Sequence, residues 1–101
     1  MDLGTTIKTL RKQRAETQAD FAVKCKITQT YLSQIENNRK EPNLATLKRI
    51  SKGLEIPLPI IFYLSLNEED ISPEKRKYFS MIDSPLKSMV NEFFFLQGES
   101  V

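Results

Sequence analysis

The stretch Thr17–Glu36 decides the fold, and its sequence is TQADFAVKCKITQTYLSQIE. Its apolar residues recur at spacings of three and four, which is the period of an α-helix. Thr17 and Thr28 stand where a side-chain oxygen caps the start of a helix, and Lys24–Lys26 leads into the turn between them. The stretch therefore predicts two short helices joined by a tight turn.

A polar row follows the outer side of the second of these helices. Its members are Gln29, Thr30, Ser33 and Gln34. A glutamine amide both donates and accepts hydrogen bonds, so it matches the edge of adenine in the major groove of DNA, and the start of an exposed helix is the part that reaches base edges. Taken alone, the row also fits a merely solvated helix face.

The segments on either side of this stretch are helical in pattern as well. No alternation of period two marks a strand, and apolar residues keep their spacing of three and four. We expect a first helix over about Thr5–Arg14, a fourth capped by Asn43 with Gly53 as its C′ residue, and a very apolar fifth after Pro57. The predicted fold class is therefore all-α.

The polar run Asn67–Asp70 is the best candidate for a domain boundary. It divides the chain into a helix-turn-helix domain over residues 1–66 and a helical extension over residues 67–101. Ser72–Glu74 has the serine, proline and acid of a helix start. Asp83–Pro85 is expected to end that sixth helix and begin a seventh.

Charge is divided unevenly along the chain. Residues 1–56 hold 11 lysines and arginines against 6 aspartates and glutamates, a balance of +5, whereas residues 57–101 hold 4 against 7, a balance of −3. The basic part contains the two-helix pattern, and the acidic part contains seven of the nine aromatic residues. This division predicts a nucleic-acid face and a separate packing face.

Several classes of protein are disfavoured by composition. The chain has no histidine and one cysteine, which excludes a Cys/His metal site, and it has no glycine-rich phosphate loop. Enzymatic activity is therefore the weakest functional hypothesis, and no catalytic residue, metal or cofactor is expected. Cys25 is expected to be a packed thiol. No apolar run is long enough to span a membrane and no signal peptide is visible, so we expect a soluble, cytoplasmic protein.

At the level of motifs, Thr17–Ile56 resembles the lambda-repressor-like, Cro/C1-type helix-turn-helix family, also called the XRE family. The matching positions are Gln18, Ala22, Ile27, Leu32–Glu36, Asn37–Arg39, Pro42, Leu44, Leu47 and Gly53–Ile56. The resemblance implies a five-helix lambda-repressor-like DNA-binding bundle followed by a short helical C-terminal extension. One position departs from the family, because Lys26 stands in the turn where the family usually has glycine and where positive φ is often required.

The resemblance also implies roles for individual residues. Those implied for contact with DNA bases are Gln29, Thr30, Ser33 and Gln34. Those expected at the DNA backbone are Gln18, at the start of the second helix, and Asn38, Arg39 and Lys40, in the loop after the third. Alternatively, the amide of Gln18 braces side chains of the third helix, which is the helix expected to read the bases. The alternative for residues 38–40 is an ordinary cationic loop that does not contact DNA. Arg11 and Glu36 resemble a family pair that bridges the first and third helices.

The aromatic residues near the C-terminus exceed what a core of this size covers, and exposed apolar patches usually mark interfaces. We expect a homodimer through the fifth helix and the extension. The residues assigned to its interface are Ile61, Phe62, Phe79, Phe93 and Phe94.

Two classes of function remain at this point. The first is a dimeric transcriptional regulator, most often a repressor in this family, that binds a pseudo-palindromic operator in double-stranded DNA. Ser33–Arg39 and Lys52–Glu55 also resemble restriction–modification controllers, which activate as well as repress. The second class is a protein-binding module of the same fold, antitoxin-like or phage-regulator-like, which engages a protein partner through the C-terminal extension.

Overall fold

The computed structural model describes residues 1–95, and these residues form helices and loops without a β-strand. The elements in chain order are α1 (Leu3–Gln13), α2 (Gln18–Lys24), α3 (Gln29–Glu36), α4 (Leu44–Leu54), α5 (Leu58–Leu64), the 3₁₀ turns η1 (Glu68–Asp70) and η2 (Pro73–Lys75), and α6 (Arg76–Phe94). The all-α prediction is confirmed.

Side-chain caps begin the three helices that build the centre of the fold. The backbone N–H of Asp20 donates to Thr17 Oγ1 at 3.1 Å, and that of Tyr31 donates to Thr28 Oγ1 at 3.0 Å. In α4, Asn43 Oδ1 accepts from the backbone N–H of Thr46 at 2.8 Å. Each such cap stabilises its helix by about 1 kcal/mol, so local chemistry fixes where α2, α3 and α4 start.

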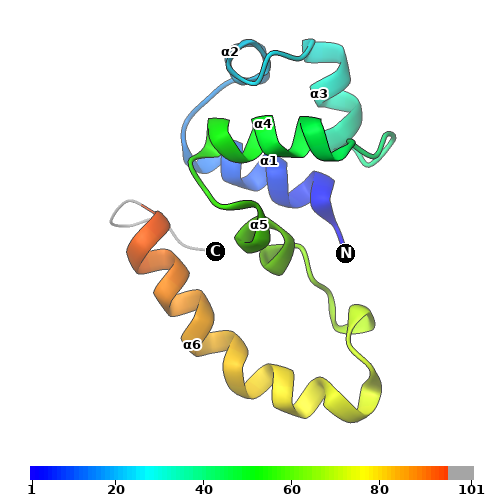
Figure 1. The fold of residues 1–101 in the computed structure, drawn as a ribbon, viewed down its shortest axis with the longest axis vertical. Helices are drawn as coiled ribbons and strands as arrows, with labels where there is room; N and C mark the ends of the chain where they lie inside the picture. The colour runs from blue at the N-terminus through cyan, green and yellow to red at the C-terminus, as the bar shows by residue number, and fades with distance from the viewer. Residues whose placement is uncertain (96–101) are drawn as a thin grey trace.

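The core lies among α1 to α5. Its buried apolar residues are Ile7, Leu10, Phe21, Ala22, Cys25, Leu32, Ile35, Leu47, Ile50, Leu54, Ile56 and Ile61. Helix α1 contacts both α3 and α5, and α2 contacts α3. Figure 1 shows the result: α2 and α3 form one end of the molecule, α5 lies in the middle, and α6 runs along the opposite end.

The end of α4 differs from the prediction. Gly53 lies inside the helix, and Glu55 takes the left-handed conformation, with φ of 58°. Gly53 is needed for space, because a Cβ there would lie 2.8 Å from Cys25 Sγ and 3.2 Å from Phe21 Cε1. The prediction that Gly53 is the C′ residue was wrong, since this glycine permits α4 to pack closely on α2.

Helix α6 also differs from the prediction, because it continues through Pro85. A proline inside a helix removes one N–H donor and strains the turn before it, and Figure 1 shows α6 bending along its length. Pro85 is exposed, so water can reach the backbone around the missing hydrogen bond. The predicted break at Asp83–Pro85 was wrong.

Tyr63 on α5 contacts the middle of α6. Its hydroxyl donates a hydrogen bond to the Asp83 carboxylate, and its ring lies 6.2 Å from that of Phe79, centre to centre. Further along α6, Val90 is buried. These contacts hold α6 beside α5. Within residues 1–95, no helix combines the length and apolar character needed to cross a membrane.

Candidate nucleic-acid interface

Helix α3 presents its polar row outward. Gln29 and Thr30 are exposed and Gln34 is half-buried, whereas Leu32 and Ile35 on the other side are buried in the core. Ser33 is half-buried on the outer side. The helix is therefore anchored by its apolar residues and leaves the polar row to face a ligand.

The turn between α2 and α3 is tight. The backbone N–H of Ile27 donates to the Ala22 carbonyl at 3.0 Å, and Ala22 is buried where the two helices approach. Lys26 has φ of 58°, the conformation in which the family's usual glycine has no steric cost and a lysine costs about 1 kcal/mol. The turn keeps its shape despite the lysine.

A buried ion pair fixes the end of α3. Arg11 Nε donates to Glu36 Oε2 at 2.7 Å and Arg11 Nη2 donates to Glu36 Oε1 at 3.0 Å. Gln18 Nε2 donates to the same Oε1 at 2.9 Å. The pair thus ties α3 to α1, and Gln18 adds the start of α2 to the same carboxylate.

Both the oxygen and the nitrogen of the Asn38 side-chain amide form hydrogen bonds within the protein. Its Oδ1 accepts from the backbone N–H of Gly4 at 3.1 Å, and its Nδ2 donates to Asp2 Oδ1 at 2.8 Å. The hydrogen bond from Asn38, and a second from the Thr5 backbone, lower the pKa of the Asp2 carboxyl. The sequence placed Asn38 at the DNA backbone, and its side chain instead joins the loop after α3 to the start of α1.

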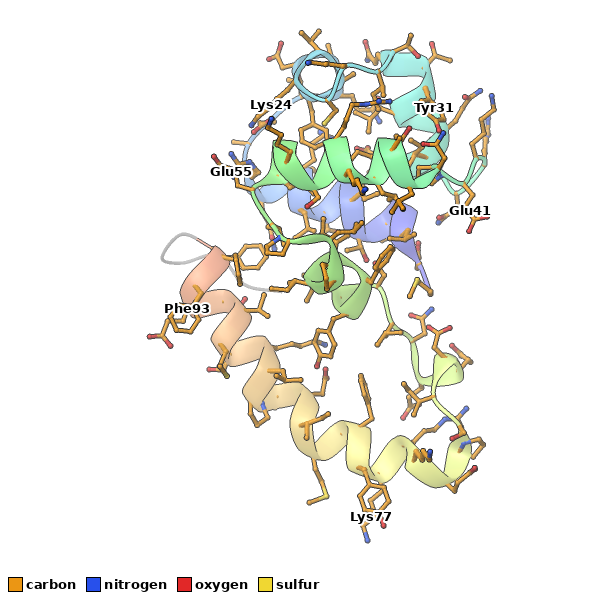
Figure 2. The ribbon with its side chains drawn as sticks, viewed as in Figure 1. Lys24, Tyr31, Glu41, Glu55, Lys77 and Phe93 are labelled. Atoms are coloured by element: carbon orange, nitrogen blue, oxygen red, sulfur yellow. The ribbon has the colours of Figure 1, made fainter. Side chains whose placement is uncertain are left out.

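Arg39 and Lys40 lie in the same loop and are exposed. Their backbone N–H groups donate to the Gln34 carbonyl, at 2.8 and 3.2 Å, which holds the loop against the end of α3. Neither side chain forms an ion pair within the described part of the chain. Figure 2 shows Glu41, their neighbour, on the opposite side of this end of the molecule from Lys24.

Asn37 was assigned from the sequence only to the loop after α3, with no role in the polar row. It caps the end of α3, is exposed, and its Nδ2 donates to Ser33 Oγ at 3.4 Å. Its spacing of four from Ser33 is the signal that places it on the same side of the helix. It extends the polar row by one residue.

The residues assigned to a dimer interface differ in exposure. Ile61 is fully buried in the core, so its side chain cannot meet a second copy, and that assignment was wrong. Phe62 and Phe79 are half-buried, whereas Phe93 and Phe94 are 68% and 37% exposed. From this set, only Phe93 and Phe94, both on α6, are exposed. Cys25, as expected, is a buried thiol, and burial raises its pKa to about 11.

Comparison with known proteins agrees with this geometry. The helix-turn-helix family matches residues 7–61. The immunity repressor protein of Bacillus phage phi105 is 32% identical over 93 residues, which are 91% of this chain and 62% of the repressor. The transcriptional regulator SutR of Escherichia coli K12 is 33% identical over 88 residues, which are 87% of this chain and 44% of SutR. The chain thus spans less than two thirds of either relative.

Two control proteins are each similar to about 60 residues or two thirds of the chain. Control protein C.MunI of Mycoplasma sp is 38% identical over 60 residues, covering 58% of this chain and 81% of that protein. A crystal structure of a mutant restriction-modification controller protein, C.Esp1396I, superposes with a TM-score of 0.61 at 31% identity, covering 66% of this chain and 87% of the controller.

Proposed function

The chain belongs to the helix-turn-helix family and is a DNA-binding transcriptional regulator, and from this premise we propose that it represses transcription by binding a pseudo-palindromic operator as a dimer. The observation that carries the proposal is the outward polar row of α3, held in place by the buried Arg11–Glu36 pair. An anchored helix with outward polar side chains is what base recognition in the major groove requires.

Gln29 is the principal base-reading residue in this proposal. It lies in the first turn of α3 and is exposed, so its amide is free to bind adenine N6 and N7 together. Thr30, Ser33 and Gln34 extend the readout along the helix. The Thr30 methyl group suits contact with a thymine methyl group.

Arg39 and Lys40 position the protein on the duplex. Both are exposed cations in the loop that follows α3, and phosphate contacts from such residues set orientation without reading sequence. Gln18 and Asn38 act differently. Their amides are engaged with Glu36, and with Gly4 and Asp2, so we assign them a bracing role behind the contacting residues.

A dimer is proposed because one recognition helix reads only a few base pairs. Two copies related by a two-fold axis read two half-sites about one helical turn apart, roughly 34–36 Å. The exposed aromatic residues of α6 supply apolar surface for such a contact.

Selection of bound sequences from random duplex DNA tests this function. We expect enrichment of an inverted repeat, and we expect Gln29→Ala/Gln34→Ala to lose it while keeping weak, salt-sensitive binding. Ser88→Ala, which changes an exposed polar residue on α6, is the matched control and should select the same repeat as the unchanged protein. Failure of the unchanged protein to enrich any sequence would overturn the proposal and favour a protein-binding module.

Controller-type regulation is a second candidate, favoured by the similarity to C.MunI and to C.Esp1396I. The two candidates differ in the sign of the transcriptional effect. A reporter carrying the selected operator at varied distances upstream of a promoter distinguishes them. Repression at every spacing supports the first, and activation at some spacings supports the second.

A further inference from the structure

A cavity with a cationic lining lies where the end of α2 meets the end of α4. Its volume is about 300 Å³, and it is lined by Lys24, Cys25, Lys26, Arg49, Lys52 and Gly53. The buried Cys25 and Gly53 form its floor. The four cations are exposed, and we call them the cationic rim. Within the described part of the chain, no carboxylate lines this cavity.

Most of the positive charge of the cationic rim has no counter-charge. Lys24 Nζ pairs with Glu16 Oε1 at 3.0 Å, and Arg49 Nη2 donates to the neutral Thr46 Oγ1 at 3.3 Å. Among residues 1–95, the other three members of the rim form no ion pair. Like charges gathered around a concave surface raise the local potential and attract an anion.

The packing of α2 against α4 brings these charges together. A Cβ on Gly53 would lie 2.8 Å from Cys25 Sγ, so the glycine lets the two helices meet at the floor of the cavity. Burial raises the pKa of the Cys25 thiol to about 11, and the charges of Lys24 and Arg49 oppose that rise. Cations from both helices therefore act on the same point.

The third cation of the rim is held at a conformational cost. Lys26 has φ of 58°, a conformation that glycine adopts without strain and lysine does not. Residues kept in such conformations cluster at ligand sites, where surrounding structure maintains them. The strained turn is thus a second feature, independent of the charge, that marks this cavity as a site.

We propose that the cationic rim binds a small anion that carries a phosphate group. The volume is at the lower end of the range for small-molecule sites, roughly 300–1,000 Å³. The guanidinium of Arg49 suits two phosphate oxygens at once, and lysines suit the same group as point charges. A phosphate monoester carries about −1.5 to −2 charges near pH 7, which matches three unpaired cations better than one carboxylate does.

The DNA backbone offers the same phosphate chemistry, but the position of the rim favours a separate ligand. Figure 2 shows Lys24 on the opposite side of this end of the molecule from Glu41, the neighbour of the proposed backbone contacts Arg39 and Lys40. A ligand in the cavity would join α4 to the turn at Lys26, directly before α3. An effect on DNA recognition through this turn rests on the proposed function, whereas the binding itself does not.

The first experiment titrates pyrophosphate into the full chain without DNA, followed by calorimetry at constant ionic strength. We expect saturable binding with a Kd below about 1 mM, and no heat of binding from sodium chloride at the same ionic strength. Lys26→Gly should weaken binding by about tenfold or more. Because glycine also relieves the left-handed turn, this variant should melt no lower than the unchanged protein, so lost binding is not lost folding.

Two further variants separate the site from general charge. Lys52→Gln should weaken pyrophosphate binding as Lys26→Gly does. Lys48→Gln is the matched control, because Lys48 is an exposed lysine of α4 that does not line the cavity, and it should bind as the unchanged protein does. Absence of binding to the unchanged protein, or equal weakening in Lys48→Gln, would overturn the inference.

The second experiment distinguishes a small ligand from the DNA backbone. We expect Lys26→Gly and Lys52→Gln to leave the slope of log K against log salt for duplex DNA unchanged. A slope reduced by about 1 in either variant would assign the rim to a DNA phosphate and overturn the small-ligand site. The two proposals fail separately, since a protein that selects no DNA sequence but binds pyrophosphate would lose only the regulator function.

Discussion

Arg11 and Glu36 form a bidentate ion pair whose side chains are only 7% and 1% exposed. It joins α1 to the last residue of α3, so the orientation of the proposed DNA-reading helix depends on a contact behind it. Removing one partner of such a pair leaves a buried charge without compensation, which is more damaging than removing both.

Replacing one partner of this pair should destabilise the fold strongly. For Arg11→Met or Glu36→Leu, we expect a loss of about 3–5 kcal/mol in the free energy of unfolding, measured by urea denaturation. The double variant should lose much less than the sum of the two single losses. Additive losses would show that the two side chains contribute independently.

Removal of Lys40 should weaken DNA binding on every sequence alike. Because its proposed partner is a phosphate, Lys40→Ala should reduce the slope of log K against log salt by about 1. Lys77→Ala is the control, since Lys77 lies at the far end of the molecule (Figure 2) and should leave the slope unchanged. An unaltered slope for Lys40→Ala would remove its phosphate role.

Gly53→Ala should destabilise the contact between α2 and α4. The added Cβ would lie 2.8 Å from Cys25 Sγ, and overpacking of a core typically costs about 1–3 kcal/mol. Cys25→Ala removes the clashing sulfur, so Gly53→Ala should be less harmful in that background than in the unchanged protein. Equal costs in both backgrounds, measured by thermal denaturation, would contradict a clash at Sγ.

The Tyr63 hydroxyl should contribute stability that disappears at high pH. Burial and the Asp83 carboxylate raise the pKa of Tyr63 above its ordinary value of 10.0. A pKa raised on folding gives a contribution that is complete below about pH 10 and is lost as the pH rises through the folded pKa.

The unfolding free energies of the protein and of Tyr63→Phe should therefore differ by a constant amount near neutral pH. Above pH 10 the difference should shrink. Tyr78→Phe changes an exposed tyrosine on α6 and supplies the control for general effects of alkali. A difference that stays constant to pH 11 would show that the contact between the Tyr63 hydroxyl and Asp83 does not exist in solution.

The helix starts of the central fold could be predicted because they depend on neighbouring residues. Thr17, Thr28 and Asn43 each bond to a backbone N–H three residues later, which a sequence shows directly. The turn at Lys26 was predicted from the family pattern, and its positive φ is found.

The remaining features depend on contacts distant in sequence. Sequence alone predicts a helix stop at Gly53, because the packing of Cys25 and Phe21 against it is visible only in the structure. Pro85 would end a helix if Tyr63 and Val90 did not hold both halves of α6 in place. Sequence alone predicts a loop amide available to DNA at Asn38, whereas Asp2 and Gly4 bind it from 36 and 34 residues away.

The buried Glu36 carboxylate accepts hydrogen bonds from Arg11 and Gln18. These contacts stabilise α3 from behind, so the stability of α3 does not depend on which residues occupy its outer side. Gln29 and Thr30 are exposed and lie outside the core, so exchanging them should cost little in folding. The protein is therefore a suitable scaffold for directed changes of target sequence, in which new outer residues are grafted while the fold is left untouched.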